Sequence, residues 1–212
     1  MPIRRRPGRV KYVSNDEHDT GQVPPPGEPR VPPGQHIVQE WPVLHEGAVP
    51  EVDLTSWDFR IFGLVEEEIR FTWDELMAMP KKTILTDIHC VTSWSRLGMS
   101  FEGIPVRAVL ERVRPLPDAE YVMVHAEHGF TTNLPLKYLL ADNVLLAYAA
   151  DGKPLTPEHG WPLRLVLPRL YFWKSAKWVR GFEFMDQDRP GFWEQNGYHM
   201  RGDPWKEERY WF

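Results

Sequence analysis

Cys90 is the only cysteine of the chain, and it lies in a polar and aromatic stretch, Asp87-Ile88-His89-Cys90-Val91-Thr92-Ser93-Trp94-Ser95-Arg96. One thiol cannot form an internal disulfide, so any special role of Cys90 is chemical. A thiolate can act as a nucleophile, as a redox sensor or as a soft metal ligand. A buried, inert side chain is the bland alternative. No CxxC or HxxxH spacing accompanies Cys90, so a zinc site is not indicated.

A second cluster of reactive residues lies downstream. It begins with His159-Gly160-Trp161-Pro162-Leu163-Arg164, passes Arg169 and ends with Tyr171-Phe172-Trp173-Lys174-Ser175-Ala176-Lys177-Trp178. Arginine forks bind phosphate at two points, lysines add charge and aromatic rings exclude water. The cluster therefore predicts a wall for a flat anionic ligand, which His159 and Arg164 could flank. A strand end with solvated charges and aromatic core anchors is the other interpretation. No glycine-rich phosphate loop is present.

Short strands and shorter helices are expected to position these residues. Residues 83–88 predict a strand that carries Cys90 at its far end, and five more strands are expected at 59–63, 68–71, 121–125, 144–148 and 163–167, with a last one at 176–184. Thr72 and Glu75 have the spacing of a capping box, so a helix is expected from there to Pro80. Further helices are expected at 105–113 and 136–140. This pattern indicates an α+β body with a mixed β-sheet rather than a doubly wound sheet.

Composition excludes several classes of protein. The net charge of −5 gives no general nucleic-acid footprint. The arginines at positions 4–6 are not followed by the apolar segment of an export signal, and no run is long enough to span a membrane. We therefore expect a cytoplasmic protein with no membrane or nucleic-acid partner. Residues 1–35 are expected to form an extended, proline-rich N-terminal arm, and residues 36–212 a single domain that includes a docked C-terminal tail.

Four ordered sequence blocks resemble the molybdopterin-binding domain of the sulfite oxidase family over roughly residues 40–185. They are His89–Ser95, Phe101–Val106, His159–Val166 and Lys174–Val179. The short, stand-alone bacterial members of the family are most similar, and the segments 189–194 and 202–205 also look like theirs. The resemblance implies the sulfite oxidase molybdopterin-binding fold, a β-rich body with short helices.

The resemblance also implies the chemistry. Cys90 is similar to the family's thiolate ligand to molybdenum, a soft donor suited to a centre already held by pterin sulfurs. The residues that match the family's pterin-binding positions are His159, Arg164, Ser175, Ala176 and Lys177. The implied reaction is two-electron oxygen-atom transfer on a small sulfur- or nitrogen-oxygen compound, with an unidentified electron-transfer partner.

The segment after Cys90 departs from the sulfite oxidases proper, which have an arginine-rich stretch there. Here one arginine, Arg96, could bind an anionic or S-oxide substrate, and the Trp-Ser pair is more similar to the methionine-sulfoxide reductase branch. Upstream, His45 lies in the region that matches a pterin-contacting segment of the family, so the resemblance implies that His45 contacts the pterin. His125, His128 and the segment 130–133 could line the substrate entrance.

Two other functions remain open at this level. Cys90 could be the nucleophile of a thiol enzyme, with His89 or His125 as its base. Alternatively, the chain could be a cofactor-binding module without turnover, which recognises a partner through the aromatic and cationic wall.

Overall fold

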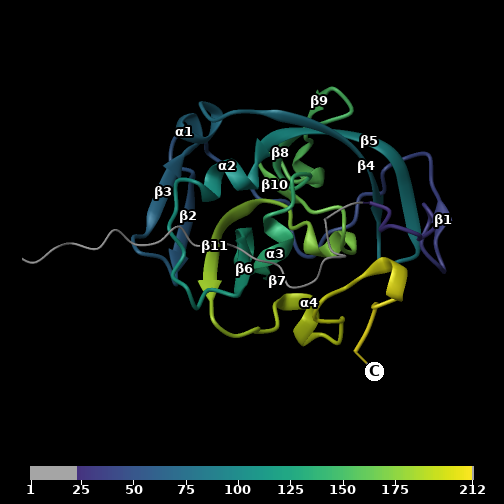
Figure 1. Cartoon of the computed structure of the whole chain (residues 1–212). Coiled ribbons are helices and arrows are strands. Elements are labelled where there is room, and N and C mark those ends of the chain that lie inside the picture. Colours follow the sequence, from purple (N-terminus) through teal and green to yellow (C-terminus); the bar gives the residue numbers. More distant parts are fainter. Residues whose placement is uncertain (1–22, 212) are drawn as a thin grey trace, which may run out of the picture.

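The computed structural model describes residues 23–211, and in this part of the chain two β-sheets dominate (Figure 1). The arginines at positions 4–6 and Phe212 lie outside the described residues, as does most of the expected N-terminal arm. None of the helices in the described part combines the length and the apolar character that crossing a membrane requires.

The larger sheet has six strands and carries the Cys90 turn. Its strand order is β1-β5-β8-β10, with β4 paired to β5 and β9 paired to β8. The strands are β1 (His36–Ile37), β4 (Lys82–His89), β5 (Trp94–Pro105), β8 (Leu145–Ala150), β9 (Lys153–Pro154) and β10 (Arg164–Val166). The hairpin of β4 and β5 arches over one side of the molecule (Figure 1). The parallel pairing of β1 with β5 fixes the N-terminal segment beside the end of this hairpin.

The second sheet has five strands in the order β3-β2-β11-β6-β7. They are β2 (Asp58–Gly63), β3 (Ile69–Thr72), β6 (Tyr121–Ala126), β7 (Thr131–Pro135) and β11 (Val179–Met185). All neighbours are antiparallel except β2 and β11, which pair in parallel across a long sequence separation. The sheet is therefore mixed, as the sequence predicted.

The helices are one or two turns long. They are α1 (Trp73–Met77), α2 (Val106–Leu110), α3 (Leu136–Leu139) and α4 (Phe192–Gln195), with the 3₁₀ turns η1 (Glu127–Gly129), η2 (Pro157–His159), η3 (Phe172–Lys174) and η4 (Pro204–Lys206). The capping box at the start of α1 is confirmed, because Thr72 and Glu75 each accept from the other's backbone N–H. This satisfies two of the amide groups that a helix start leaves free.

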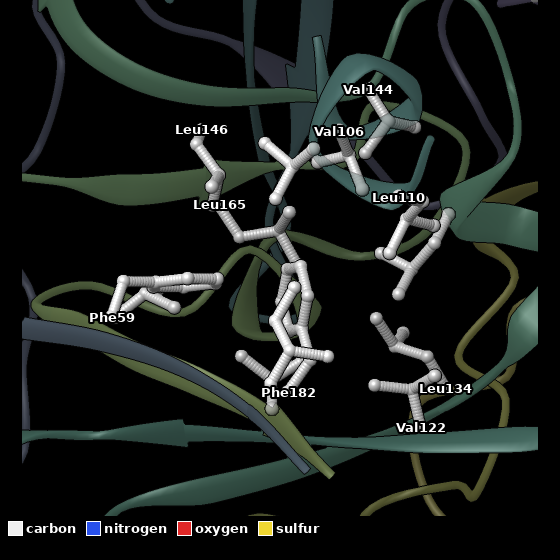
Figure 2. Packing of buried hydrophobic residues seen from close by; sticks show 14 of the residues in the cluster. Phe59, Val106, Leu110, Val122, Leu134, Val144, Leu146, Leu165 and Phe182 are labelled. Carbon is white, nitrogen blue, oxygen red and sulfur yellow. The ribbon is translucent and has the colours of Figure 1, made fainter. Parts of the chain in front are cut away.

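The main hydrophobic core joins the two sheets. Phe59 and Phe182 meet edge to face from neighbouring strands, with ring centroids 5.1 Å apart. Figure 2 shows them packed with Leu146 and Leu165 of the other sheet, and both of these leucines have no exposed surface. A second cluster of buried side chains, which includes Cys90, Trp94 and Phe101, lies at the end of the β4–β5 hairpin. Cys90 is thus held within a packed cluster of buried side chains.

Most of the expected strands are present, but the longest one was missed. No strand was expected over residues 94–105, which form β5, because Gly98, Gly103 and Pro105 obscure the strand pattern there. The last strand begins at Val179 rather than at Ala176, because Trp178 has a φ of 52° and interrupts the extended backbone. β1 and β7 were also not expected.

The described part of the N-terminal arm lies along the body. Arg30 forms a bidentate ion pair with Asp87 of β4, in which Nε and Nη2 donate to the two carboxylate oxygens at 2.7 and 2.8 Å. Trp205 of the C-terminal tail is buried and donates to the carbonyl of Pro29 at 2.7 Å. The division into an arm over 1–35 and a single domain over 36–212 stays a prediction.

Candidate functional site

Cys90 occupies a tight turn between β4 and β5. Its N–H donates to the carbonyl of Trp94 at 2.9 Å, and its carbonyl accepts from the N–H of Ser93 at 3.0 Å. Ser93 has a φ of 71°, which allows the chain to reverse. The Cys90 Sγ atom lies 3.1 Å from Thr92 Oγ1, and the residue is 9% exposed. Burial raises the pKa of the thiol, and the contact with Thr92 opposes this in part.

A pocket of about 560 Å³ opens beside Cys90. The β4–β5 turn, η1, η3 and the segments before β2 and β11 contribute to its walls. Nine of its lining residues are aromatic: Trp41, Trp94, Phe130, Phe172, Trp173, Trp178, Phe192, Trp193 and Tyr198. Large aromatic walls exclude water and strengthen the interactions of the few charges among them. The pocket is thus large enough for an organic ligand beside the thiol.

Arg164 is the most deeply buried charge in this wall, with 1% of its surface exposed. Its Nη1 and Nη2 atoms donate to the carbonyls of His159 and Ser175, at 2.8 and 2.9 Å. The guanidinium lies over the rings of Phe172 and Trp41, at 4.3 and 5.1 Å. Burial lowers the pKa of Arg164 to about 9. Its Nε atom has no hydrogen-bond partner within residues 23–211.

Lys177 supplies the second cation of the pocket. Its Nζ atom donates to the carbonyls of Leu44 and Glu158, both at 2.6 Å. Burial, reinforced by the charge of Arg164, lowers the pKa of Lys177 to about 7. Neither cation has a carboxylate within ion-pair distance in the described part of the chain. A buried and a half-buried positive group without a counter-charge favour an anionic ligand.

His159 and His45 differ in their relation to the pocket. The His159 ring lies against Trp41 at a tilt of 30° with centroids 4.0 Å apart, and its Nδ1 contacts Thr156 Oγ1 at 3.0 Å. His159 thus contacts the lining residue Trp41 but does not itself line the pocket. His45 lines the pocket itself, and its ring centroid is 5.7 Å from that of Trp178.

Ser175 and Ala176 line the pocket beside Lys177 and are both buried. The Ser175 hydroxyl accepts from the N–H of Leu167 at 2.9 Å, and the carbonyl of Ala176 accepts from the N–H of Leu165 at 2.9 Å. These bonds attach the loop to the segment that also carries Arg164. The structure thus brings Cys90, Arg164, Ser175, Ala176 and Lys177 to one pocket.

Arg96 is not among the lining residues. Its Nη1 atom donates to the carbonyl of Leu97 at 2.6 Å, and its Nη2 lies 3.7 Å from a carboxylate oxygen of Asp151. His125 is also outside the pocket and pairs with Glu183 at 2.9 Å. His128 and Phe130 line the pocket, whereas residues 131–133 do not, and a role of these residues at a substrate entrance stays a prediction.

Several lining residues were not foreseen as site residues. Glu127, Tyr198 and Thr92 all contribute to the pocket. The proximity of Thr92 to Cys90 in sequence was a usable signal for the contact with Sγ. Tyr198 had no such signal, because the C-terminal segment reaches the pocket only through the fold.

The donor set fits a molybdenum–pterin group on physical grounds. A soft thiol suits a sulfur-rich metal centre, and the two cations, of which Arg164 is buried and has a free Nε–H, suit an anionic phosphate tail. The aromatic walls suit a flat ring system. Fold and site together are those of a domain whose pocket suits an organic, anionic group and is lined by a cysteine.

Comparison with known proteins identifies the family of this chain. The family model described as "Oxidoreductase molybdopterin binding domain" matches residues 46–193. The chain belongs to this family and is a molybdopterin-dependent oxidoreductase of the sulfite oxidase-like class.

Individual relatives span a wide range of similarity. The uncharacterized oxidoreductase YuiH of Bacillus subtilis is 51% identical over 182 residues, which are 85% of this chain and 92% of that protein. The putative protein-methionine-sulfoxide reductase subunit YedZ1 of Azospira oryzae is 30% identical over 154 residues, 73% of this chain and 58% of that protein. Nitrate reductase [NADH] 2 of Phaseolus vulgaris is 27% identical over 69% of this chain, but this covers only 20% of that enzyme.

A solved structure confirms the fold. The sulfane dehydrogenase SoxCD from Paracoccus pantotrophus superposes with a TM-score of 0.63 at 23% identity, over 72% of this chain and 43% of that chain. The expected sulfite oxidase-like molybdopterin-binding fold is therefore confirmed.

Proposed function

We propose that this oxidoreductase transfers an oxygen atom to or from a small sulfur- or nitrogen-oxygen compound, and that Cys90 is the thiolate ligand to its molybdenum. The observation that carries the proposal is that Cys90 lies at a pocket whose other lining residues are mainly cationic and aromatic. The name of one relative, a putative protein-methionine-sulfoxide reductase subunit, supports a sulfur-oxygen substrate.

The chain's own residues would hold the cofactor from several sides. Arg164 and Lys177 would bind its anionic part, and their present bonds to backbone carbonyls keep both side chains at the pocket wall. Ser175 and Ala176 would fix the loop around it. His159 would act by orienting Trp41 and Arg164, and His45 would contact the cofactor from the rim.

The bound molybdenum centre supplies two-electron oxygen-atom transfer. In the reductive direction a substrate X–O takes up two electrons and two protons to give X and water, and the reverse reaction returns them. The aromatic walls exclude bulk water from the reacting atoms. The electrons must come from or pass to a separate carrier, and we propose that the protein works in the cytoplasm with such an unidentified electron-transfer partner. Arg96 contacts Leu97 and Asp151 rather than the pocket, so it is given no role in this step.

The geometry does not favour a cysteine nucleophile. Within residues 23–211, neither His89 nor His125 makes a hydrogen bond to Cys90 Sγ. Burial also lowers the pKa of His89 to about 4 and raises that of the thiol, so neither group is activated. A general base must lie within hydrogen-bond reach of its nucleophile.

Metal and pterin analysis of freshly purified protein tests the proposal. The wild-type protein should contain about one molybdenum and one pterin per chain and reduce S- or N-oxides with a reduced viologen dye, or oxidise the reduced compounds with ferricyanide. Cys90→Ser should abolish turnover while thermal unfolding stays close to that of the wild type. An active protein without molybdenum, or full activity in Cys90→Ser, would refute it.

A further inference from the structure

Residues from both ends of the described chain hold the turn that carries Cys90. Near the C-terminal end, Arg209 donates from Nη1 to the carbonyl of Val91 at 2.5 Å. From the N-terminal side, Gln35 donates from Nε2 to the carbonyl of Cys90 at 3.1 Å. Two successive carbonyl groups of the turn thus receive side-chain donors from segments that are remote in sequence.

Backbone bonds fix the N-terminal partner next to the turn. The N–H of His36 donates to the carbonyl of Ser93 at 2.9 Å, and the N–H of Val38 donates to that of Ser95 at 2.9 Å. These bonds flank the short β1–β5 ladder. Gln35 is therefore held in place beside Cys90 by its own neighbours.

Arg209 is equally well fixed. Its carbonyl accepts from the N–H of His199 at 3.1 Å, and its guanidinium lies 5.1 Å over the ring of Tyr171. Its Nη2 atom is 3.4 Å from the carbonyls of Pro33 and Gly34. Gly34 has a φ of 67°, and a Cβ there would lie 3.1 Å from Nη2, so glycine permits this close approach. Arg209 thereby links the two terminal segments to the turn. In Figure 1 the C-terminal segment (yellow) and β1 lie on the same side of the molecule.

We propose that Arg209, with Gln35, is a positioning residue that fixes the orientation of Cys90 Sγ toward the metal site. The inference rests on the proposed ligation of molybdenum by Cys90. Gln35 holds the Cys90–Val91 peptide through the carbonyl of Cys90, and Arg209 holds the next peptide through the carbonyl of Val91 with a charged and therefore stronger donor. Groups behind a metal ligand commonly set its orientation. Both positioning residues lie outside residues 46–193, which the family model matches.

If Arg209 only held the C-terminal tail in place, its loss would not affect the Cys90 turn. Arg201 provides the control for this alternative. Arg201 pairs with Glu208 in the same tail, with Nε 2.8 Å from Oε2, and within residues 23–211 it makes no hydrogen bond or ion pair to the Cys90 turn. Arg201→Met should weaken the tail without changing the turn. Arg209→Met replaces the side chain by an unbranched one without donors. It should weaken both the attachment of the tail and the hold on the Cys90 turn.

Hydrogen exchange of the full-length protein, followed by mass spectrometry of peptides that cover residues 88–96, tests the positioning directly. Losing a hydrogen bond from a charged donor should speed exchange there by about tenfold or more in Arg209→Met. Arg209→Lys, which keeps one charged donor, should restore much of the protection, and Arg201→Met should leave this segment unchanged. Gln35→Met should act in the same direction as Arg209→Met and replaces it if that variant does not fold.

Electron paramagnetic resonance of the loaded protein gives a second measurement. The molybdenum signal should shift or broaden in Arg209→Met, recover in Arg209→Lys and match the wild type in Arg201→Met. Wild-type exchange at residues 88–96 in folded Arg209→Met or Gln35→Met would overturn the positioning role, as would an unchanged spectrum. A different outcome is that Arg209→Met exchanges faster at residues 88–96 but the wild-type protein itself binds no molybdenum. That result would support the role of Arg209 in holding the turn and refute the proposed ligation by Cys90.

Discussion

Burial pushes Cys90, Arg164 and Lys177 toward their neutral forms, which raises the pKa of the thiol and lowers the pKa of both cations. Such a set is costly without a ligand, because charged groups lose hydration in the pocket. An anionic group bound beside the two cations would offset that cost. The physical properties of these three residues therefore agree with a site built for a charged prosthetic group.

Arg164 should decide how much cofactor the protein retains. Arg164→Met removes a buried charge and its donors, and a lost charge-assisted hydrogen bond should lower pterin occupancy by about tenfold or more. Quantification of pterin and molybdenum per chain measures this, and circular dichroism and thermal unfolding verify that the variant is folded. Full occupancy in a folded Arg164→Met protein would contradict the assigned role.

Lys177 should titrate close to neutral pH in cofactor-free protein. Because its folded pKa of about 7 lies below the ordinary value of 10.5, its burial disfavours folding below pH 7, and this cost disappears as the pH rises toward 10.5. An anionic ligand favours the charged form, so its affinity should fall as the pH rises through 7.

Carbon-13 NMR of reductively methylated lysines measures this titration. The signal that is absent in Lys177→Arg should titrate near pH 7 without cofactor and at a clearly higher pH with it. Titration near the ordinary lysine value in the cofactor-free protein would exclude the effect.

At the scale of secondary-structure elements, the β4–β5 hairpin positions the site, and β5 requires a glycine to pack against β8. A Cβ at position 103 would lie 2.3 Å from the carbonyl oxygen of Leu146 and 2.7 Å from the Cα of Ala147. Both are backbone atoms and cannot move aside without separating the strands.

Gly103→Ala should therefore destabilise the protein by about 1–3 kcal/mol or more. Ser100→Ala, on the same strand, should change the free energy of unfolding by about 0.5 kcal/mol or less. Urea unfolding of the two variants makes the comparison. Equal stability of both would mean that β5 and β8 are not as closely packed as described.

The elements that the sequence predicted are those with a strong local pattern. The capping box of Thr72 and Glu75, the strand before Cys90 and the cationic segment 174–177 all have short-range signals. β5 was missed because Gly98, which has a φ of 66°, and Gly103, which packs against the backbone of Leu146, weaken the local strand pattern. The two-residue strand β1 and the contribution of Tyr198 to the pocket depend on long-range pairing, which local periodicity does not encode.

At the scale of the whole molecule, a fully buried ion pair connects the pocket wall to the C-terminal region. Lys174 Nζ lies 2.6 Å from Glu194 Oε1, and it also donates to the side chain of Asn133 and to the carbonyl of Met200. Trp173, which lines the pocket, donates to the same carboxylate oxygen at 2.8 Å. The pair therefore joins η3, β7 and α4 around one edge of the site.

Lys174→Met should cost about 3–5 kcal/mol, because it leaves the carboxylate of Glu194 buried without a counter-charge. The double variant Lys174→Met/Glu194→Gln should recover part of this loss, since it removes the unpaired charge. Equilibrium unfolding in urea measures both. If the double variant is no more stable than Lys174→Met, the buried charge is not the source of the loss.

Coordination of molybdenum by Cys90 is the central claim, and X-ray absorption at the molybdenum edge tests it most directly. Loaded wild-type protein should show one more sulfur ligand than loaded Cys90→Ser protein, in which an oxygen donor replaces the thiolate. The same number of sulfur ligands in both proteins would contradict the claim.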